Sequence, residues 1–371
     1  MRKIRVLIVD DSTVIRRLLS DALATDPAIE IAGIAANGRI ALSKIPQINP
    51  DIITLDMEMP EMDGLTTLVE LRKLYPKLPV IMFSTLTQRG AESTLEALAK
   101  GANDYVTKPA NVGSVNAAIQ SVQNELLPKI KQFCKWVTPA IANSVKPADW
   151  ISGLHGIAPS NLQAGGKPSR VDIVVIGTST GGPNALSTVL PRIPANFPVP
   201  ILIVQHMPPI FTAHLAERLN QLSNLHVHEA ADGDLLEPGG AWLAPGNFHL
   251  KIRRQGTQLK AVLSQEQPEN SCRPAVDVLF RSAAELFGAN VLSVVMTGMG
   301  QDGQRGSGVV RDAGGRVVVQ DEATSVVWGM PGAVANAGHA HQIVPLQKIA
   351  DEIILQTQSG RTVRTLAKAG T

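Results

Sequence analysis

The sequence predicts an α/β protein with two doubly wound parallel-sheet domains joined by a linker. Apolar runs of strand length alternate with amphipathic helical stretches over residues 1–125, and the same alternation begins again at Val171. Between the two series, Pro and Gly residues interrupt every regular period. Strands that alternate with helices are typical of parallel sheets covered by helices on both faces.

The first domain is expected over residues 1–125 and has five strand-helix units. Its expected strands are Arg5–Val9, Ile29–Ala35, Ile52–Leu55, Val80–Phe83 and Asp104–Val106. Helices fit between them, for example at Val14–Ala24 and Gly64–Leu74. A last helix over Ser114–Cys134 leaves the domain and contains Pro128, a residue that can kink a helix. Residues 126–170 are therefore assigned to a helix extension and linker.

The second domain is expected over residues 171–357, followed by a tail over 358–371. Its expected strands are Asp172–Gly177, Pro200–Gln205, Val227–Ala230, Ala241–Ala244, Asn290–Thr297 and Arg316–Gln320. Its expected helices are Pro183–Leu190, Phe211–Leu222, Pro274–Phe287 and Gln304–Ala313. The segment Asn247–Ser264 is expected to form a hairpin that turns at Gln255–Gly256.

The composition excludes several classes of protein. Lys and Arg number 34, Asp and Glu number 32, and no long run of one sign occurs, which argues against nucleic acid as a partner. The 2 cysteines are far apart in the chain, so a disulfide framework is not expected and a reducing, cytoplasmic compartment is. The apolar run near the N-terminus is too short for a signal peptide, and no membrane insertion is expected.

Acidic residues end two expected strands of the first domain. Asp10 and Asp11 follow the first strand and Asp56 follows the third. Carboxyl ends of parallel strands share one sheet edge, where three carboxylates would repel one another without a cation. Mg²⁺ with a phosphoryl group fits such oxygen ligands. Each acid taken alone is more simply explained as a helix cap or a solvated loop residue.

The other strand ends of this domain supply a hydroxyl at Ser84 and an ammonium at Lys108. The segments LIVDDS, LDMEMPEMDG, MFSTLT and GANDYVTKP resemble response-regulator receiver domains, which have a flavodoxin-like fold. The resemblance implies that Asp56 is the phospho-acceptor and that Asp11 and Asp56 bind Mg²⁺, with Asp10 supporting the metal shell. It also implies that Ser84, Tyr105 and Lys108 sense the phosphoryl group.

A Gly-x-Ser-x-Gly turn follows the first strand of the second domain, and Ser179 is its central residue. Such a strand-to-helix turn projects a serine hydroxyl above the sheet, beside the free N–H groups of a helix start. A Gly-rich turn at this place also suits a nucleotide pyrophosphate. However, the next strand ends at His206 rather than at the acid that a ribose needs.

His206 is the candidate general base and Asp302 its candidate partner, because each follows an expected strand that ends at the same edge. Asp302 is alternatively a turn residue, or a cap of the helix that follows it. A structural role is the simpler reading for the remaining histidines; His339 and His341 resemble a metal pair only loosely and have no third ligand. The chain order Ser, His, Asp differs from that of α/β-hydrolases.

The segments IGTSTGGPNAL, VQHMPPIFT, APGNFHL, MTGMGQDG and VWGMPGA resemble the chemotaxis protein-glutamate methylesterase family (CheB), whose catalytic domain is Rossmann-like. The resemblance implies Ser179 as nucleophile, His206 as base and Asp302 as its partner. It also implies oxyanion support from Thr180 and the N–H of Met299, with no cofactor in this domain. One departure is Thr178, where alanine is usual.

The expected function is therefore hydrolysis of glutamate methyl esters on chemoreceptors, with deamidation of receptor glutamines as a second activity. The resemblance implies a chemotaxis histidine kinase as phosphodonor, and a receiver domain that blocks the Ser179 edge until it is phosphorylated. The alternative is a response regulator whose output domain only binds a partner or a nucleotide. A dinucleotide-dependent oxidoreductase is disfavoured because the ribose acid is missing.

Overall fold

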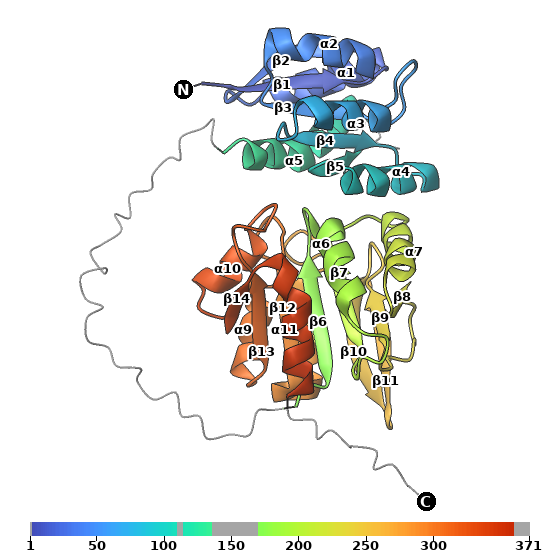
Figure 1. The fold of residues 1–371 in the computed structure, drawn as a ribbon, viewed down its shortest axis with the longest axis vertical. Helices are drawn as coiled ribbons and strands as arrows, with labels where there is room; N and C mark the ends of the chain where they lie inside the picture. The colour runs from blue at the N-terminus through green and yellow to red at the C-terminus, as the bar shows by residue number, and fades with distance from the viewer. Residues whose placement is uncertain (1, 110–113, 136–169, 360–371) are drawn as a thin grey trace, which may run out of the picture. The chain divides into compact units, whose positions relative to one another are not determined.

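The computed structural model describes residues 2–109, 114–135 and 170–359. These residues form two α/β domains with parallel sheets, which confirms the predicted fold class (Figure 1). Most of the predicted linker and most of the predicted tail lie outside the described residues. None of the helices in the described ranges combines the length and the apolar character that a membrane crossing requires.

The first domain is a 5-stranded sheet in the order β2-β1-β3-β4-β5, which is the flavodoxin-like order. Its strands are β1 (Ile4–Val9), β2 (Ile29–Ala35), β3 (Ile52–Asp56), β4 (Val80–Ser84) and β5 (Asp104–Thr107). Its helices are α1 (Thr13–Ala24), α2 (Gly38–Ile48), α3 (Gly64–Leu74), α4 (Gln88–Ala99) and α5 (Val115–Phe133). Each predicted strand and helix is present within one or two residues of its predicted ends.

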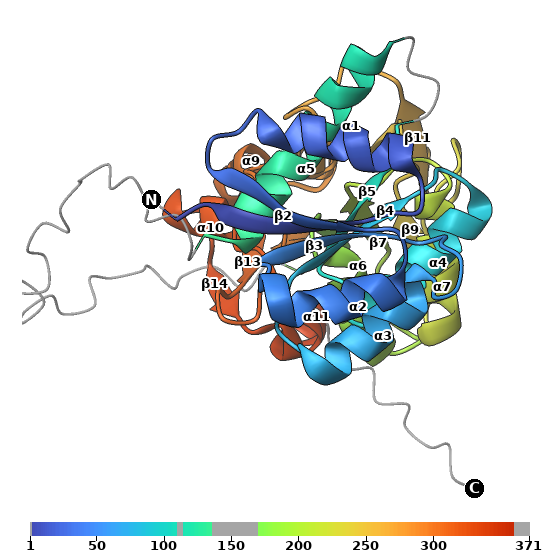
Figure 2. The ribbon, with the colours of Figure 1, turned by 90° about the horizontal axis from the view of Figure 1, so that it is seen from above.

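Side chains of the helix starts define where the first-domain helices begin. At all five helices the N-cap side chain accepts a hydrogen bond from a backbone N–H of the first turn. These N-cap residues are Ser12, Asn37, Asp63, Thr87 and Ser114. Helices α1 and α5 pack together on one face of the sheet, and α2 and α3 pack on the other (Figure 2). The apolar strands are therefore covered on both sides, and the sites at the strand ends rest on a rigid core.

The second domain is a 7-stranded sheet in the order β14-β13-β12-β6-β7-β9-β8. Its strands are β6 (Ile173–Thr178), β7 (Ile201–Gln205), β8 (His226–Glu229), β9 (Gly240–Leu243), β12 (Val291–Val295), β13 (Arg316–Gln320) and β14 (Gln342–Val344). Its α-helices are α6 (Gly182–Val189), α7 (Phe211–Leu222), α8 (Val276–Phe287), α9 (Gln304–Asp312), α10 (Met330–Asn336) and α11 (Leu346–Gln358). Two short 3₁₀ turns, Leu190–Arg192 and Gly288–Asn290, follow α6 and α8.

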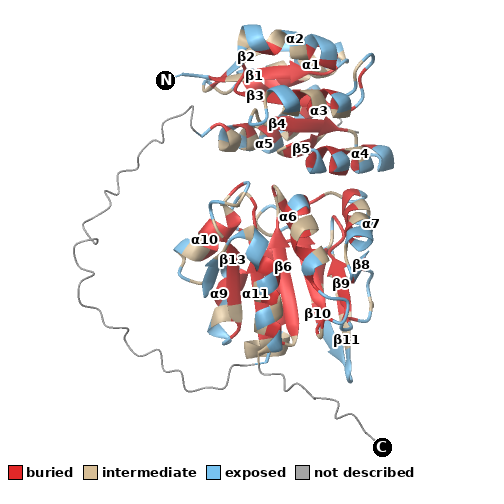
Figure 3. Ribbon diagram, viewed as in Figure 1, coloured by how far each residue is buried: buried red, intermediate tan, exposed pale blue. Residues whose placement is uncertain are grey.

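The middle of this sheet is formed by β12, β6 and β7, which pair in parallel. All three strands are buried along their whole length, as expected for apolar runs covered on both faces (Figure 3). Figure 1 shows α6 and α11 in front of the sheet, whereas α8 packs with α9 and with strand β10. The carboxyl ends of the three central strands therefore meet at one edge of a rigid layer.

The hairpin of this domain is confirmed, but its predicted turn is wrong by one residue. Strands β10 (His249–Gln255) and β11 (Gln258–Ser264) pair from His249↔Ser264 to Gln255↔Gln258, so the turn is Gly256–Thr257. Gly256 has φ of 60°, which glycine adopts without steric cost. Helices α10 and α11 and the edge strand β14 are not among the predicted elements.

Candidate functional site

The predicted acidic pocket of the first domain is formed. Asp10 follows β1 directly and Asp56 is the last residue of β3, and these strands are neighbours in the sheet. Asp10, Asp11 and Asp56 each offer a carboxylate oxygen, and these oxygens lie within 4.8 Å of one another. Asp10 and Asp56 are buried, whereas Asp11 is exposed. This is the only such group of three metal-ligating side chains in the described part of the chain.

Lys108 is the cation of this pocket. Its Nζ lies 2.8 Å from Asp56 Oδ2 and 3.1 Å from Asp10 Oδ2. Burial, together with the charge of Asp10, raises the pKa of Asp56 to about 6 although Lys108 opposes the shift. Burial likewise raises the pKa of Asp10. One ammonium therefore does not fully offset the cost of burying two carboxylates, and a divalent cation would favour their ionised forms.

The donor set fits Mg²⁺, which binds carboxylate oxygens and keeps water and phosphate in its shell. Asp10 Oδ2 is buried and, although Lys108 lies near it, accepts no well-directed hydrogen bond in the described structure. Its lone pairs remain for a metal shell. Of the predicted sensing residues, Ser84 ends β4 and is fully buried, and Tyr105 lies on β5 with 8% of its surface exposed. The N–H of Lys108 donates to the Ser84 carbonyl oxygen at 2.7 Å, which joins two of these positions.

In the second domain, the register of the central strands brings Ser179 and His206 together. Thr178 on β6 pairs with Gln205 on β7, so the next residues of the two parallel strands are Ser179 and His206. The N–H of His206 donates to the Thr178 carbonyl oxygen at 3.2 Å. The N–H of Ser179 donates to Thr297, just beyond β12, at 3.1 Å. Ser179 is therefore fixed between the ends of its two neighbouring strands.

Gln205 connects the two residues further. Its Nε2 donates to the carbonyl oxygens of Ser179 at 3.0 Å and of His206 at 3.1 Å. Its Oε1 accepts the hydroxyl of Thr178 at 2.7 Å. Thr178, the departure from the family pattern, thus supplies a hydrogen bond that alanine lacks. A Cβ at Gly182, at the start of α6, would lie 1.9 Å from Gln205 Oε1 and 2.8 Å from Thr178 Cβ, so a larger residue there would displace the Gln205 side chain from these contacts.

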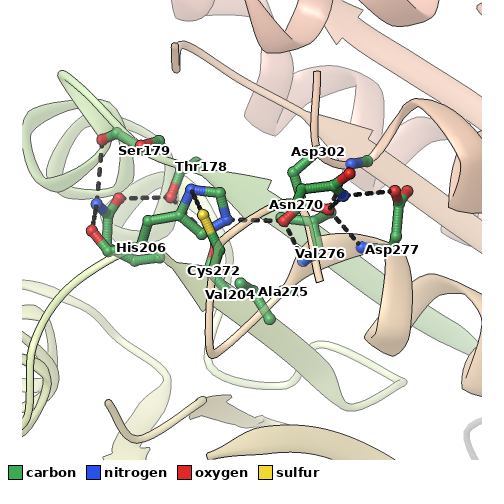
Figure 4. Close-up of polar contacts among 12 residues, drawn as sticks. Thr178, Ser179, Val204, His206, Asn270, Cys272, Ala275, Val276, Asp277 and Asp302 are labelled. Carbon is green, nitrogen blue, oxygen red and sulfur yellow. Dashed lines mark hydrogen bonds and ion pairs between the residues drawn. The ribbon is translucent and has the colours of Figure 1, made fainter. Parts of the chain in front are cut away.

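His206 and Asp302 form the expected base-carboxylate pair. His206 Nε2 lies 2.8 Å from Asp302 Oδ2 (Figure 4). The other ring nitrogen, Nδ1, lies 3.6 Å from the sulfur of Cys272. No hydrogen bond joins the Ser179 hydroxyl to His206 in the residues that the structure describes. In hydrolases this contact often tightens only when substrate is bound, so Ser179 stays a prediction as the nucleophile.

The Asp302 carboxylate is held by backbone and side-chain donors together. Backbone N–H groups of Val276 and Gly303 donate at 2.7 and 3.0 Å, and that of Asp277 at 3.0 Å. Asn270 Nδ2 donates at 2.8 Å. The alternative that Asp302 caps the following helix is wrong: Gly303 is the N-cap of α9 without a side-chain cap bond, and Asp302 instead accepts from the first turn of α8.

These contacts set the ionisation of the pair. Burial raises the pKa of Asp302, but the His206 contact and the N–H groups of Val276 and Asp277 outweigh burial and hold this pKa below its ordinary value. Burial lowers the pKa of His206, whereas Asp302 and Cys272 raise it more, so it lies above its ordinary value. Neutral imidazole, which a general base needs, is therefore populated as the pH rises through this raised pKa.

The two predicted support residues also lie at this edge. Thr180 is buried, and its carbonyl oxygen accepts the Thr297 hydroxyl at 2.9 Å. The loop that contains Met299 passes directly against Ser179: a Cβ on Gly298 would lie 2.9 Å from Ser179 Cβ. Their roles in oxyanion binding stay predictions.

Sequence reasoning missed the residues that surround the pair. Gln205, Asn270, Cys272 and Asp277 all contact predicted site residues, and none was predicted to have a role. A polar Gln at the end of an otherwise apolar strand, next to His206, was a usable signal. Asn270 and Cys272 lie in an irregular loop whose position depends on tertiary packing, so no period or motif identifies them.

Comparison with known proteins identifies the family. The CheB methylesterase family model matches residues 174–353, and the response regulator receiver domain model matches residues 6–120. A protein-glutamate methylesterase/protein-glutamine glutaminase of Trichodesmium erythraeum (strain IMS101) is 53% identical over 360 residues, which cover 95% of this chain and 99% of that protein. The chain belongs to the CheB family.

A second CheB relative agrees. A protein of the same name from Nocardioides sp. (strain ATCC BAA-499 / JS614) is 50% identical over 357 residues, which cover 95% of this chain and 95% of that protein. The crystal structure of the Thermotoga maritima CheB methylesterase catalytic domain is 44% identical, covers 50% of this chain and 99% of that chain, and has a TM-score of 0.49. The relatives carry the names of enzymes, which supports the esterase prediction and not the alternative of a purely binding output domain.

Proposed function

We propose that this CheB protein is a phosphorylation-regulated esterase that hydrolyses glutamate methyl esters on chemoreceptors and deamidates receptor glutamines. The observation that carries the proposal is the meeting of Ser179, His206 and Asp302 at one sheet edge, with His206 already bonded to Asp302 at 2.8 Å. We infer a cytoplasmic protein, because both cysteines are free thiols.

The proposed reaction is a two-step acyl transfer. Nδ1 of His206 accepts the Ser179 proton as the hydroxyl oxygen attacks the ester carbonyl carbon, and backbone N–H groups bind the oxyanion that forms. The C–O bond to methoxide then breaks, and His206 donates its proton to release methanol. Water attacks the acyl-enzyme with His206 again as base, which frees the glutamate carboxylate and restores Ser179. With a glutamine substrate, the same steps release ammonia in place of methanol.

Asp302 supports both proton transfers. Its carboxylate binds Nε2, which leaves Nδ1 as the ring nitrogen that can take the serine proton, and it stabilises the imidazolium formed at each step. Because Asp302 is itself held at the start of helix α8, its charge stays in place throughout.

The acidic pocket is the proposed phosphoryl-acceptor site, with a chemotaxis histidine kinase as donor. Asp56 is the nucleophile, and Asp11 and Asp56 are the Mg²⁺ ligands, with Asp10 in the metal shell. The bound ion would neutralise charge on the phosphoryl oxygens. Lys108 lies 2.8 Å from Asp56 and supplies a second positive charge there. Ser84 and Tyr105 are the proposed sensors of the modification.

The test of the esterase is methanol release from membranes that contain methylated chemoreceptors. The full chain is expected to release methanol in proportion to enzyme and time, because the ester methoxide leaves in the first step. Receptors whose methylated glutamates are replaced by alanine are the control and should give none. Methanol release no greater than that of the control would contradict the proposed function.

Stimulation by a small-molecule phosphodonor such as acetyl phosphate, with Mg²⁺ present, is expected to depend on Asp56. In the Asp56→Ala variant the ratio of methanol release with donor to release without donor should fall to about one, since the proposed acceptor carboxylate is absent. The exposed Asp21→Ala change on α1 is the matched control and should keep the wild-type ratio. Equal stimulation of the Asp56 variant would remove Asp56 as acceptor.

A further inference from the structure

The loop before helix α8 contains a tight turn with an unusual backbone. The N–H of Glu269 donates to Cys272 O at 3.1 Å and the N–H of Cys272 donates to Glu269 O at 2.9 Å. The two residues between them have positive φ values, 52° at Asn270 and 62° at Ser271. Asparagine is favoured at the first such position, but glycine is favoured at the second. Ser271 therefore holds a conformation that must be stabilised by surrounding contacts.

Side chains on both sides of the turn supply these contacts. Glu269 pairs with Arg281 of α8 through two hydrogen bonds of 2.7 and 2.5 Å. Asn270 Nδ2 donates to Asp277 Oδ2 at 2.9 Å and to Asp302 Oδ1 at 2.8 Å. Figure 4 shows the Asn270 amide between these two carboxylates, on the far side of Asp302 from His206.

The two carboxylates need a donor between them. Asp277 is fully buried and Asp302 is 2% exposed. Asp277 also accepts the N–H of Gly306 at 2.6 Å. An amide NH₂ has two N–H bonds and no charge, so it can satisfy one oxygen of each acid. Without it, two buried like charges would face each other, and such a pair retains a proton to higher pH.

We infer that Asn270 is a positioning residue of the proposed esterase: its amide keeps the Asp302 carboxylate ionised and aimed at His206 by separating it from Asp277. The inference rests on the proposed function, since it assigns a role in the same proton-transfer chain. Asn270 touches neither the serine nor the expected substrate carbon, so it acts only through Asp302.

Other charged groups around the pair come from each neighbouring element. The sulfur of Cys272 lies 3.6 Å from Nδ1 of His206. The charge of Glu269, in the turn, interacts with that of Asp302. The positive charge of Arg281, on α8, attracts the carboxylates of Asp277 and Asp302. The positive charge of Arg305, on α9, attracts the carboxylate of Glu269. Burial and the charge of Asp302 raise the pKa of Asp277, which is therefore the acid most ready to hold a shared proton.

The test deletes the amide while keeping the turn. Asn270→Gly suits a φ of 52° and removes only the side chain. The methanol-release kcat is expected to fall about 10- to 100-fold, because a hydrogen bond to a buried charge is lost. The titration midpoint of the His206 ring, followed by NMR of ¹³C-histidine-labelled full chain, should move about one pH unit lower as Asp302 shares a proton with Asp277.

Three further variants distinguish the loss of the Asn270 amide donor from a change in the conformation of the turn. Asn270→Asp restores the volume and the turn but not the donor, so it should not restore kcat. Ser271→Gly relaxes the turn and keeps the Asn270 amide. The His206 ring of this variant should have the wild-type titration midpoint. Asn290→Gly removes an amide that donates to Asp172 at 2.9 Å at the opposite end of the sheet, and it should also titrate as wild type.

A His206 titration in Asn270→Gly that coincides with wild type, or wild-type kcat in Asn270→Asp, would overturn the inference. The ring titration needs no esterase activity. If the methanol assay fails while the midpoint still moves, the proposed function is at fault and the role of Asn270 in holding Asp302 stands. If methanol is released normally and the midpoint does not move, Asn270 alone is misassigned.

Discussion

Replacing Ser179 with alanine is expected to reduce methanol release by about 10⁴-fold or more, as loss of the nucleophile does in other serine hydrolases. The acyl-enzyme cannot form without the hydroxyl, so His206 and the oxyanion donors are left to act on water alone. Methanol release from methylated receptors at saturating substrate measures the change. Binding of the receptor should persist, because the variant removes one oxygen and keeps the turn before α6.

Ser187→Ala is the matched control for this variant. Ser187 lies on α6, the helix that follows the Ser179 turn, and its hydroxyl donates to the Pro183 carbonyl oxygen at 2.8 Å. This control should retain activity within about twofold, because the hydroxyl bonds only within its own helix in the described structure. An Ser179→Ala enzyme that releases methanol at a rate comparable with the control would exclude Ser179 as nucleophile, and with it the proposed two-step mechanism.

The parallel sheets were predictable because their strands are continuous apolar runs. Strand β6 is buried at every residue, and the sequence Ile173–Thr178 contains no charge that would contradict that placement. Parallel strands that share a sheet end at the same edge, so acids and bases that follow such runs converge whatever their separation in the chain. For this reason Asp10 and Asp56 could be placed together from sequence, and so could His206 and Asp302.

Contacts made by loops were not predictable in the same way. The hairpin turn was misplaced by one residue because Gln255–Gly256 and Gly256–Thr257 both satisfy the preference for glycine at a turn. Asn270 is 32 residues from Asp302 and reaches it only because α8 packs beside α9. Likewise, a cap of α9 was the alternative considered for Asp302, since local sequence favours the nearest helix. It caps α8 instead, which only the assembled domain reveals.

The Asp302→Asn variant is expected to show the second large effect, a fall in kcat of about 10³- to 10⁴-fold. Every polar contact of the Asp302 carboxylate in the described structure is with a donor: His206, Asn270 and backbone N–H groups. The side-chain amide of this variant would place its NH₂ group against one of these donors. Either His206 then adopts the wrong tautomer, or a backbone N–H of α8 loses its acceptor.

The pH dependence separates this change from simple unfolding. Asp302 raises the pKa of His206, so removal of its charge should lower that pKa, and the residual activity should reach its plateau at lower pH than in wild type. Asp312→Asn on α9 is the matched control, since its carboxylate is exposed and pairs only with Arg311 in the described structure. A folded Asp302→Asn enzyme with wild-type kcat and an unshifted profile would show that His206 does not depend on this carboxylate.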